Sequence, residues 1–531
     1  MVKRFRSMTI RTGAACLFVP VLAAAQAPAM TESAIGAVRV EGNTLLPVPT
    51  LTALTRDVVG MAPTLPLLTA LAARIQAAYR DAGYGGVVAY VPVQESLDGS
   101  VVVRVVEGRL AVVRVSGNAH FSTANILAGL PDLRQGATPL VRAIDRDIQL
   151  TNSNPAKQVN VSLRAGTRPG EIAADVKVAD EQPLRYLLGY NNTGNSMTGR
   201  HRISVGIEHA NLFGRDHVGT LQYQTAPENP GRVRIFSGGY RIPLYAHAAS
   251  FDAFVAHSTV NNGTTATTAG PLTFTGRGTI IGLRGNRHLA RLGEYDHQLT
   301  LGLDRRDYKD DCAIGDFGAA GCGSAAVDVT TVPVSLTYTG QKGSSAFAYG
   351  FNAGLSVNAG GSAARTFEAA RPGAKRRYVL SRVAAFFQQP LTENVSVYAR
   401  MEAQVSGHAL ISAEKFGLGG SGSVRGYAER EMSGDSGVLL RFEAATGSID
   451  TWGLPLRPYL FVDHGRVTNR GNLPCLGRAS TPCHLTGAGI GARVSLYRHA
   501  GASLDVGRAL EDGTTSSQGD VRAHLALNLA F

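Results

Sequence analysis

The sequence lacks any segment long enough to cross a membrane as a helix. A spanning helix needs about 20 consecutive apolar residues, and the apolar run at residues 14–22 is shorter than that. It follows a basic stretch at residues 3–11 and ends in small residues, which is the pattern of a secretory signal peptide with cleavage expected after Ala25. A membrane location for the mature chain therefore requires strands.

Acidic residues are in the minority. The formal net charge is +12, and the predicted signal peptide, residues 1–25, holds four basic and no acidic residues, which leaves +8 on the remainder. A basic balance favours nucleic acid or an anionic membrane surface as partner. Because an exported chain meets no nucleic acid, we expect the membrane surface and no nucleic-acid partner.

Cysteine is scarce, with five residues in the whole sequence, of which Cys16 lies in the predicted signal peptide. The other four form two close pairs, Cys312 with Cys322 and Cys475 with Cys483. In an exported protein such pairs predict two local disulfides. A zinc site is the alternative, but the pairs lie far apart and neither has metal-finger spacing. We therefore expect no metal and no other cofactor.

Motifs of catalytic and nucleotide sites are also missing. The sequence holds no H-E-x-x-H, no G-x-S-x-G and no phosphate loop. Gly417, Gly419 and Gly422 fit G-x-G-x-x-G, but a dinucleotide site needs a buried parallel strand before this motif and a helix after it. Neither pattern is present, so we expect a protein that is not an enzyme.

The sequence does contain a repeat of about 75 residues near its start. Val38-Arg-Val-Glu-Gly-Asn43 returns as Val113-Arg-Val-Ser-Gly-Asn118, and each copy predicts a short strand that ends in a turn. Helical and strand patterns follow each copy, with helices near 68–79 and 141–150 and strands near 87–93, 101–106, 158–163 and 172–178.

This β-α-α-β-β order resembles the POTRA module, so we expect one module at residues 35–109 and a second at residues 110–182. The resemblance implies that the sheet edges of the modules bind an extended client by strand addition. The alternative is two generic α+β domains that act as a spacer.

From residue 184 to the end, short runs alternate apolar and polar residues. Leu299, Leu301 and Leu303, for example, alternate with Gln298, Thr300 and Asp304. In a soluble sandwich the apolar face would point to a core, whereas in an outer-membrane barrel it meets lipid and the polar face lines a lumen.

About sixteen such strands are joined by connections that alternate between short and long, and the long ones hold both cysteine pairs. The last strand alternates up to Phe531, and this ending resembles the sorting signal of bacterial outer-membrane barrels. We therefore predict a transmembrane β-barrel of about 16 antiparallel strands over residues 184–531, with both cysteine pairs in extracellular loops. Its lumen-facing charges, expected to be solvated, include Asp304, Arg400, Glu402, Arg441 and Glu443.

The longest surface loop, residues 408–437, contains Val424, Arg425, Gly426 and Tyr427 in sequence. They resemble the V-R-G-Y signature of a loop that folds back into POTRA barrels, and Phe461, Asp463 and Gly465 resemble its F-x-D-x-G partner motif on a strand. Period two directs Asp463 into the lumen, where Arg425 can supply a bidentate cation. The alternative is that Arg425 is a solvated loop residue and Asp463 an ordinary lumen residue.

Further motifs narrow the resemblance. Asn152-Ser-Asn-Pro155 and Asn211-Leu-Phe-Gly214 are similar to segments of two-partner secretion transporters, the TpsB group of ShlB/FhaC/HecB-like haemolysin secretion/activation proteins. The resemblance implies a monomeric pore, surrounded by outer-membrane lipid and lipopolysaccharide, with its modules in the periplasm. It would recognise an unfolded partner exoprotein there and secrete it to the cell surface.

Two other functions stay open at this point: a factor that inserts or folds other barrels, and a passive pore. One feature departs from the TpsB group, whose members commonly carry an amphipathic plug helix before the first module. Only about ten residues, 26–35, are available for it here. We therefore expect the inward-folded loop alone to close the pore.

Overall fold

The computed structural model describes residues 34–94, 99–196, 198–260, 263–274, 277–309, 327–344, 346–451, 453–474, 483–496 and 499–531. The predicted signal peptide and Cys312, Cys322 and Cys475 lie outside these ranges. The chain divides into two compact units, one of Met1–Ala78 with Val88–Val106 and one of Tyr79–Val87 with Glu107–Phe531. No helix among the described residues is long and apolar enough to cross a membrane.

The first module is a three-stranded sheet with two helices. Its elements are β1 (Ala37–Glu41), α1 (Val48–Thr55), the short helix η1 (Arg56–Val58), α2 (Leu65–Asp81), β2 (Val87–Tyr90) and β3 (Ser100–Glu107). The strand order is β1-β3-β2, with β1 parallel to β3. Leu71 and Ile75, on the predicted apolar stripe of α2, are buried together with Val103 of β3, so the helix covers the sheet with its apolar face.

The second module repeats this plan with β4 (Arg109–Ser116), α3 (Thr123–Ala128), α4 (Val141–Thr151), β5 (Lys157–Ala165) and β6 (Glu171–Asp180). Its strand order is β4-β6-β5. The repeated Gly-Asn turn has the same cause in both modules. Gly42 and Gly117 have positive φ, and a Cβ on either would lie within 2.3 Å of a carbonyl oxygen, that of Val105 or of Val178. Only glycine fits such a close approach.

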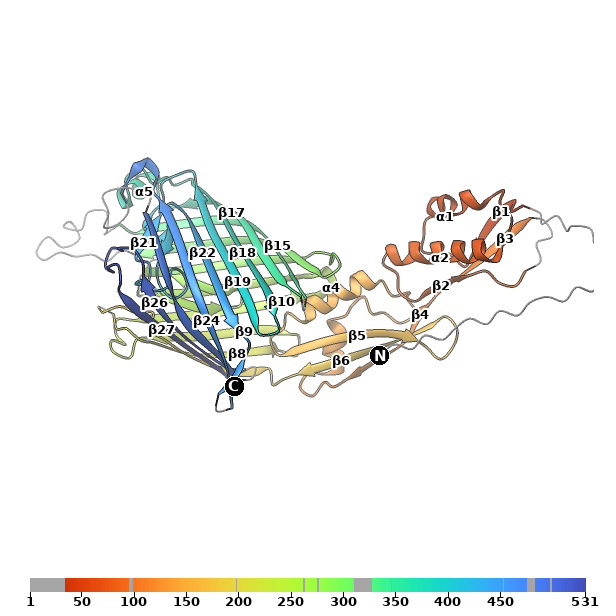
Figure 1. Ribbon diagram of the computed structural model, residues 1–531, viewed down its shortest axis with the longest axis horizontal. Coiled ribbons are helices and arrows are strands. Elements are labelled where there is room, and N and C mark those ends of the chain that lie inside the picture. The colour runs from red at the N-terminus through yellow and green to blue at the C-terminus, as the bar shows by residue number, and fades with distance from the viewer. Residues whose placement is uncertain are drawn as a thin grey trace, which may run out of the picture. The chain divides into compact units, whose positions relative to one another are not determined.

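The remaining strands form a closed antiparallel barrel (Figure 1). Its sixteen long strands, counted over the described residues, are β7 (Leu184–Asn191), β8 (Arg202–Leu212), β9 (His217–Thr225), β10 (Arg234–Leu244), β11 (Ala249–Ser258), β14 (Arg277–His288), β15 (Tyr295–Lys309), β16 (Val329–Gly343), β17 (Ala348–Gly361), β18 (Val379–Thr392), β19 (Val395–Ser406), β22 (Ser436–Thr446), β24 (Leu454–Thr468), β25 (Cys483–Leu496), β26 (Ala500–Ala509) and β27 (Val521–Ala530). This confirms the predicted fold class. The barrel closes where β27 pairs with β7.

The barrel is apolar outside because its strands alternate. Leu301 and Leu303 of β15 are 60% and 45% exposed on the outer surface, whereas Asp304, on the opposite face, is 4% exposed. The connections alternate in length as predicted, and the long ones hold most of the smaller elements. These smaller elements are η2 (Tyr245–His247), β12 (Gly263–Thr267), β13 (Gly270–Phe274), α5 (Ala364–Ala370), η4 (Ser412–Glu414), β20 (Phe416–Leu418), β21 (Met432–Gly434), β23 (Ile449–Thr451) and η5 (Arg470–Asn472).

A buried ion pair joins the second module to the barrel within the second unit. Lys157 at the start of β5 is 2% exposed and bonds to Asp216, in the short turn between β8 and β9. Its ammonium also donates to the Asn125 side chain at 3.1 Å, and Tyr245 donates to Asp216 at 2.6 Å. The sheet of the second module is thus fastened to two short connections of the barrel.

A second segment folds inward besides the predicted loop. The connection between β11 and β14 contains the hairpin β12–β13, and β12 runs along β9, β10 and β11. Arg241, near the turn-side end of β10, donates to the carbonyl of Thr268 at the hairpin tip at 2.6 Å. The predicted loop is therefore not the only segment of the described chain inside the lumen. The expectation that this loop alone closes the pore stays a prediction.

Candidate functional site

The predicted inward-folded loop connects β19 to β22 through residues 407–435. Its two sides pair as β20 with β21, so the loop is a hairpin with an irregular tip. Gly426, in the V-R-G-Y motif, has a φ of 98°, and a Cβ on it would lie 2.9 Å from the backbone of Arg508 in β26. A glycine is required for the tip to touch the wall here.

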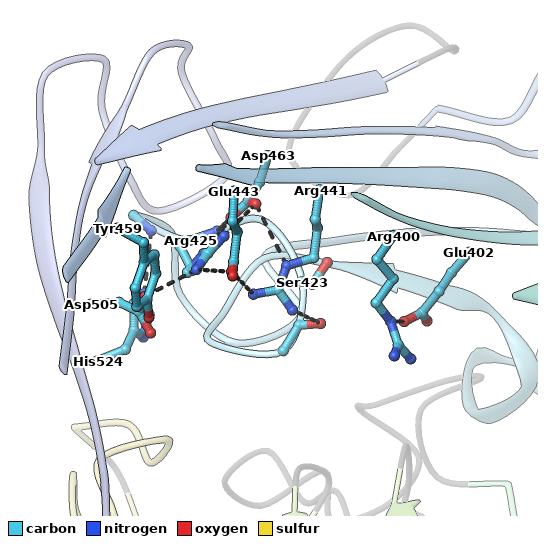
Figure 2. Close-up of polar contacts among 12 residues, drawn as sticks. Arg400, Glu402, Ser423, Arg425, Arg441, Glu443, Tyr459, Asp463, Asp505 and His524 are labelled. Atoms are coloured by element: carbon cyan, nitrogen blue, oxygen red, sulfur yellow. Dashed lines mark hydrogen bonds and ion pairs between the residues drawn. The ribbon is translucent and has the colours of Figure 1, made fainter. Parts of the chain in front are cut away.

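Arg425 lies at the tip and is fully buried. Its Nε and Nη2 donate to the two carboxylate oxygens of Asp463 at 2.7 and 2.8 Å, a bidentate ion pair. Its Nη1 donates to Glu443 at 2.8 Å and to Asp505 at 3.0 Å. Figure 2 shows the guanidinium enclosed by these three carboxylates, which project from the paired strands β22 and β24 and from β26, which lies beyond β25.

Aromatic rings complete the site. The guanidinium carbon of Arg425 lies 3.6 Å from the ring centre of Phe461, a geometry that adds a cation–π attraction. Tyr459, two residues earlier on β24, donates to Asp505 at 2.5 Å. The face of the Phe461 ring therefore attracts the guanidinium, while Tyr459 orients the carboxylate of Asp505.

Small residues in the wall leave room for the loop. A Cβ on Gly465 would lie 2.4 Å from the Leu418 side chain, and a Cβ on Gly507 would lie 2.6 Å from the amide nitrogen of Gly426. The glycine of the strand motif thus serves close packing against the loop.

The other two residues of the loop motif bind the wall through packing and backbone contacts. Val424 and Tyr427 are fully buried in an apolar cluster shared with the wall residues Leu439 and Leu485. The Tyr427 hydroxyl lies 2.8 Å from the carbonyl oxygen of Thr486. All four motif residues therefore face the wall.

Acidic residues connect the stem of the loop to other long connections of the barrel. Asp435 is fully buried and accepts from Arg371 and from the amides of Leu410 and Arg470. Glu431 accepts from the amide of Ser516, in the connection between β26 and β27, at 2.8 Å. The loop is therefore part of a network of loop contacts at this end of the barrel.

Glu443 and Asp505 bind Arg425, a role that neither motif predicts. Glu443 and Asp304 are expected from the sequence to be solvated channel charges, but they are 5% and 4% exposed. Glu443 binds Arg425, and Asp304 binds Arg284 and Arg306, so that expectation is wrong for these two residues. Alternation along residues 500–509 places Asp505 on the lumen face, but it does not give the height at which Asp505 lies in the barrel. Among the described residues no group of three or more His, Cys, Asp and Glu side chains could hold a metal ion.

Comparisons with known proteins agree with this architecture. Residues 170–494 match the family described as haemolysin secretion/activation protein ShlB/FhaC/HecB, and residues 34–108 match the POTRA domain of ShlB type. The outer membrane transporter CdiB of Dickeya dadantii (strain 3937) is 22% identical over 86% of this chain and 79% of its own length. CdiB of Escherichia coli O6:K15:H31 (strain 536 / UPEC) is 25% identical over 74% of this chain and 64% of its own length. The solved structure of CdiB from Escherichia coli has the same fold, with a TM-score of 0.75 at 20% identity over 95% of this chain and 92% of that one.

Proposed function

Because the chain belongs to the ShlB/FhaC/HecB family of haemolysin secretion/activation proteins, we propose that it binds an unfolded exoprotein in the periplasm and threads it through its lumen. The protein is a transporter of the outer membrane, with POTRA modules in the periplasm, and it secretes a partner exoprotein to the cell surface. We assign residues 35–109 and 110–182 to the two modules and residues 184–531 to the barrel. No catalytic step is part of this function.

The Arg425 site supports a closing role for the inward loop. The loop motif, Val424 to Tyr427, is buried against the wall, and the guanidinium takes one bidentate and two single ion pairs. A contact of this kind keeps the loop in the lumen until a client or a thermal fluctuation displaces it. This single observation carries the proposed mechanism: transport requires the loop to leave the site.

The free edges of the module sheets support client binding. In the second module β5 is an edge strand, and no other strand of the described chain pairs with its outer side. On that side, the side chain of Asn152 donates to the carbonyl of Val159 and accepts from its amide, so this one residue of β5 is already paired. Gln158, Asn160 and Ser162 are exposed on β5, so we expect backbone pairing rather than apolar contact to hold an extended client.

The sheet of the first module likewise has two edge strands, β1 and β2, and deletion of residues 36–108 tests client binding by that module. We expect the barrel to assemble and the culture medium to lose one protein, the partner, which mass spectrometry of the medium then identifies by comparison with the wild type. Normal secretion by the deletion variant would leave the module as a spacer only. Loss of other outer-membrane barrels instead of a secreted protein would favour an assembly factor.

The outer wall supports lipid and lipopolysaccharide as further partners of a monomeric barrel. Leu221, Phe236 and Val255 are 63%, 51% and 48% exposed there, around an apolar groove of about 560 Å³. Buried in a bilayer, such residues meet acyl chains. Native mass spectrometry from detergent should give one barrel per particle, with lipid adducts.

We further propose that Cys312 pairs with Cys322 and Cys475 with Cys483, in extracellular loops. Cys483, the first residue of β25, is disulfide-bonded, which supports the second pair. Each bond closes a short ring and should stabilise its loop by about 2–3 kcal/mol. Peptide mapping of the unreduced protein should recover two linked pairs, and four free thiols would exclude both.

A further inference from the structure

We propose that Glu414 is a second anchor of the inward loop on the barrel strands, a positioning residue that holds the root of the loop against β15 and β18. The inference rests on the proposed function in one respect, that the loop closes the lumen. Glu414 ends the short helix η4, just before β20, and is 2% exposed. A buried carboxylate is stable only when cations and hydrogen-bond donors surround it.

Three side chains of the wall supply those partners. Arg306 Nη1 lies 2.9 and 3.1 Å from the two carboxylate oxygens of Glu414, and the Tyr308 hydroxyl donates to one of them at 3.0 Å. Arg382 Nη2 approaches the other oxygen at 3.5 Å. Arg306 and Tyr308 belong to β15 and Arg382 belongs to β18. Glu414 is therefore held by strands of the barrel and not by neighbouring loops.

The same wall also holds the two sides of the loop together. Gln404 of β19 is 2% exposed, and its side-chain amide donates to the carbonyls of Glu414 and Asp435 at 3.0 and 3.1 Å. Its carbonyl oxygen accepts from Arg382 at 2.9 Å. The root of the loop is thus bound to the wall as one unit.

The two anchors have opposite charge and lie on different strands. At the tip, a cation of the loop binds carboxylates of β22, β24 and β26, whereas at the root a carboxylate of the loop binds cations of β15 and β18. No residue serves both anchors. Their contributions to the closed state should therefore add in free energy.

The wall contains ion pairs of its own, so that its buried charges keep polar partners when the loop leaves. Arg306 also donates to Asp304 at 2.7 Å, and Asp304 accepts from Arg284 at 2.5 Å. At the tip, Glu443 is paired with Arg493 at 2.7 Å and Asp463 lies 3.5 Å from Arg441. Arg306, Glu443 and Asp463 therefore keep a counter-ion of the wall when the loop moves, and Asp505 keeps its hydrogen bond from the Tyr459 hydroxyl at 2.5 Å. Glu414 and Arg425 pass into water. This arrangement suits a releasable contact rather than a permanent one.

Single-channel recording of the purified full-length protein in planar lipid bilayers, with no client present, tests the proposal. The measured quantity is the ratio of closed to open dwell times for the wild type, Glu414→Gln, Arg425→Gln and the double variant. Because each change removes a charged hydrogen-bonding partner, we expect each single variant to lower the ratio about tenfold or more and the double variant to lower it by about the product.

Glu402→Gln is the matched control. Glu402 is an acid of β19 that binds Arg400 at 2.6 Å, apart from the carboxylates around Arg425 (Figure 2). We expect this variant to keep the wild-type ratio. Tyr308→Phe removes one hydrogen bond to Glu414 with little change in packing, and it should lower the ratio by a smaller factor even if Glu414→Gln assembles poorly.

A purely structural role for Glu414 would lower the unfolding temperature of the barrel and leave the dwell-time ratio unchanged, and that result would overturn the proposal. An equal effect of Glu402→Gln would overturn it as well. Because the recording needs no client, a failure of the secretion assay contradicts the proposed function, whereas an unchanged ratio contradicts the anchor.

Discussion

Arg425 shares its charge among three carboxylates, and this sharing determines what each substitution should do. Asp463→Ala leaves Glu443 and Asp505 within 3.0 Å of the guanidinium, so the loop keeps two of its ion pairs. Arg425→Ala removes all of them. We expect Arg425→Ala to weaken loop docking by up to about 3–5 kcal/mol and Asp463→Ala by about 1–3 kcal/mol.

Transport needs a loop that docks in the lumen again after each release, so a loop that docks weakly should impair it. Secretion of the partner, measured at matched barrel levels in the outer membrane, should fall more in Arg425→Ala than in Asp463→Ala. The double variant should be little worse than Arg425→Ala, because residues in contact do not contribute independently. Additive losses in the double variant, or a larger loss from Asp463→Ala, would show that the two residues do not act as partners.

The sequence predicts that Arg425 pairs with Asp463, because each lies in a short motif. It does not predict that Glu443 and Asp505 join them. Alternation fixes which face of a strand a residue occupies, but the height at which β22, β24 and β26 align depends on the register of pairing across the whole barrel. Asp505 also lies 42 residues from Asp463 in a segment without a motif. Only the register of the strands in the structure shows that Glu443 and Asp505 lie at the height of Arg425.

At the scale of single elements, helix α4 of the second module carries a buried acid. Asp147 is 1% exposed and accepts from the amide of Asp132 at 2.8 Å. Burial raises the pKa of Asp147 to about 7, with the charge of Asp132 acting in the same direction and Arg146 in the opposite one. The folded module therefore favours the protonated acid.

Since the folded-state pKa exceeds the ordinary value of 3.8, the stability from this proton is complete at low pH and is lost as the pH rises through 7. Above pH 7, the buried charge of Asp147 lowers the free energy of unfolding by about 4 kcal/mol. Asp147→Asn should remove it and stabilise α4 at pH 8 but not at pH 4.

Hydrogen exchange of the full-length protein in detergent, read on peptides covering residues 141–151, measures this difference. Rates are compared after correction for the intrinsic pH dependence of exchange. The expected result is equal protection of the two proteins at pH 4 and greater protection of Asp147→Asn at pH 8. The same loss of protection in both proteins would assign the pH dependence to another group.

Elements differ in how well the sequence predicts them. The long strands are predicted because one face meets lipid and must be apolar, which produces a strict period of two. The sequence does not predict the hairpin β12–β13, since residues 263–274 are mostly glycine, threonine and alanine. A strand inside the lumen has no lipid-facing side, so it carries no apolar alternation. The same reason accounts for the short pair β20 and β21.

At the scale of the whole molecule, two segments of the described chain lie inside the lumen instead of one. Alternating connection lengths predict which loops are extracellular, because the POTRA modules mark the periplasmic end. They did not indicate that the connection between β11 and β14 turns inward as β12–β13. The lumen wall shows the consequence: Phe254, Ala256 and Ile280 are buried apolar residues on the face that is otherwise polar.

The contact of this hairpin with β10 supplies a direct test of its role in closure. Arg241 donates to the Thr268 carbonyl, and a Cβ on Gly239, two residues away on the same face, would lie 2.7 Å from the Thr268 amide nitrogen. Gly239→Ala must therefore displace the hairpin tip, at a cost of about 1–3 kcal/mol.

If the hairpin contributes to closure, Gly239→Ala should lower the ratio of closed to open dwell times in planar bilayers by about fivefold or more. Gly238→Ala is the matched control, because it makes the same change on the outer face, where the new methyl would lie 3.1 Å from the movable end of the Leu221 side chain. We expect the control to conduct like the wild type. Equal ratios in both variants would mean that the hairpin lies in the lumen without restricting it, and closure would then depend on the Arg425 loop alone.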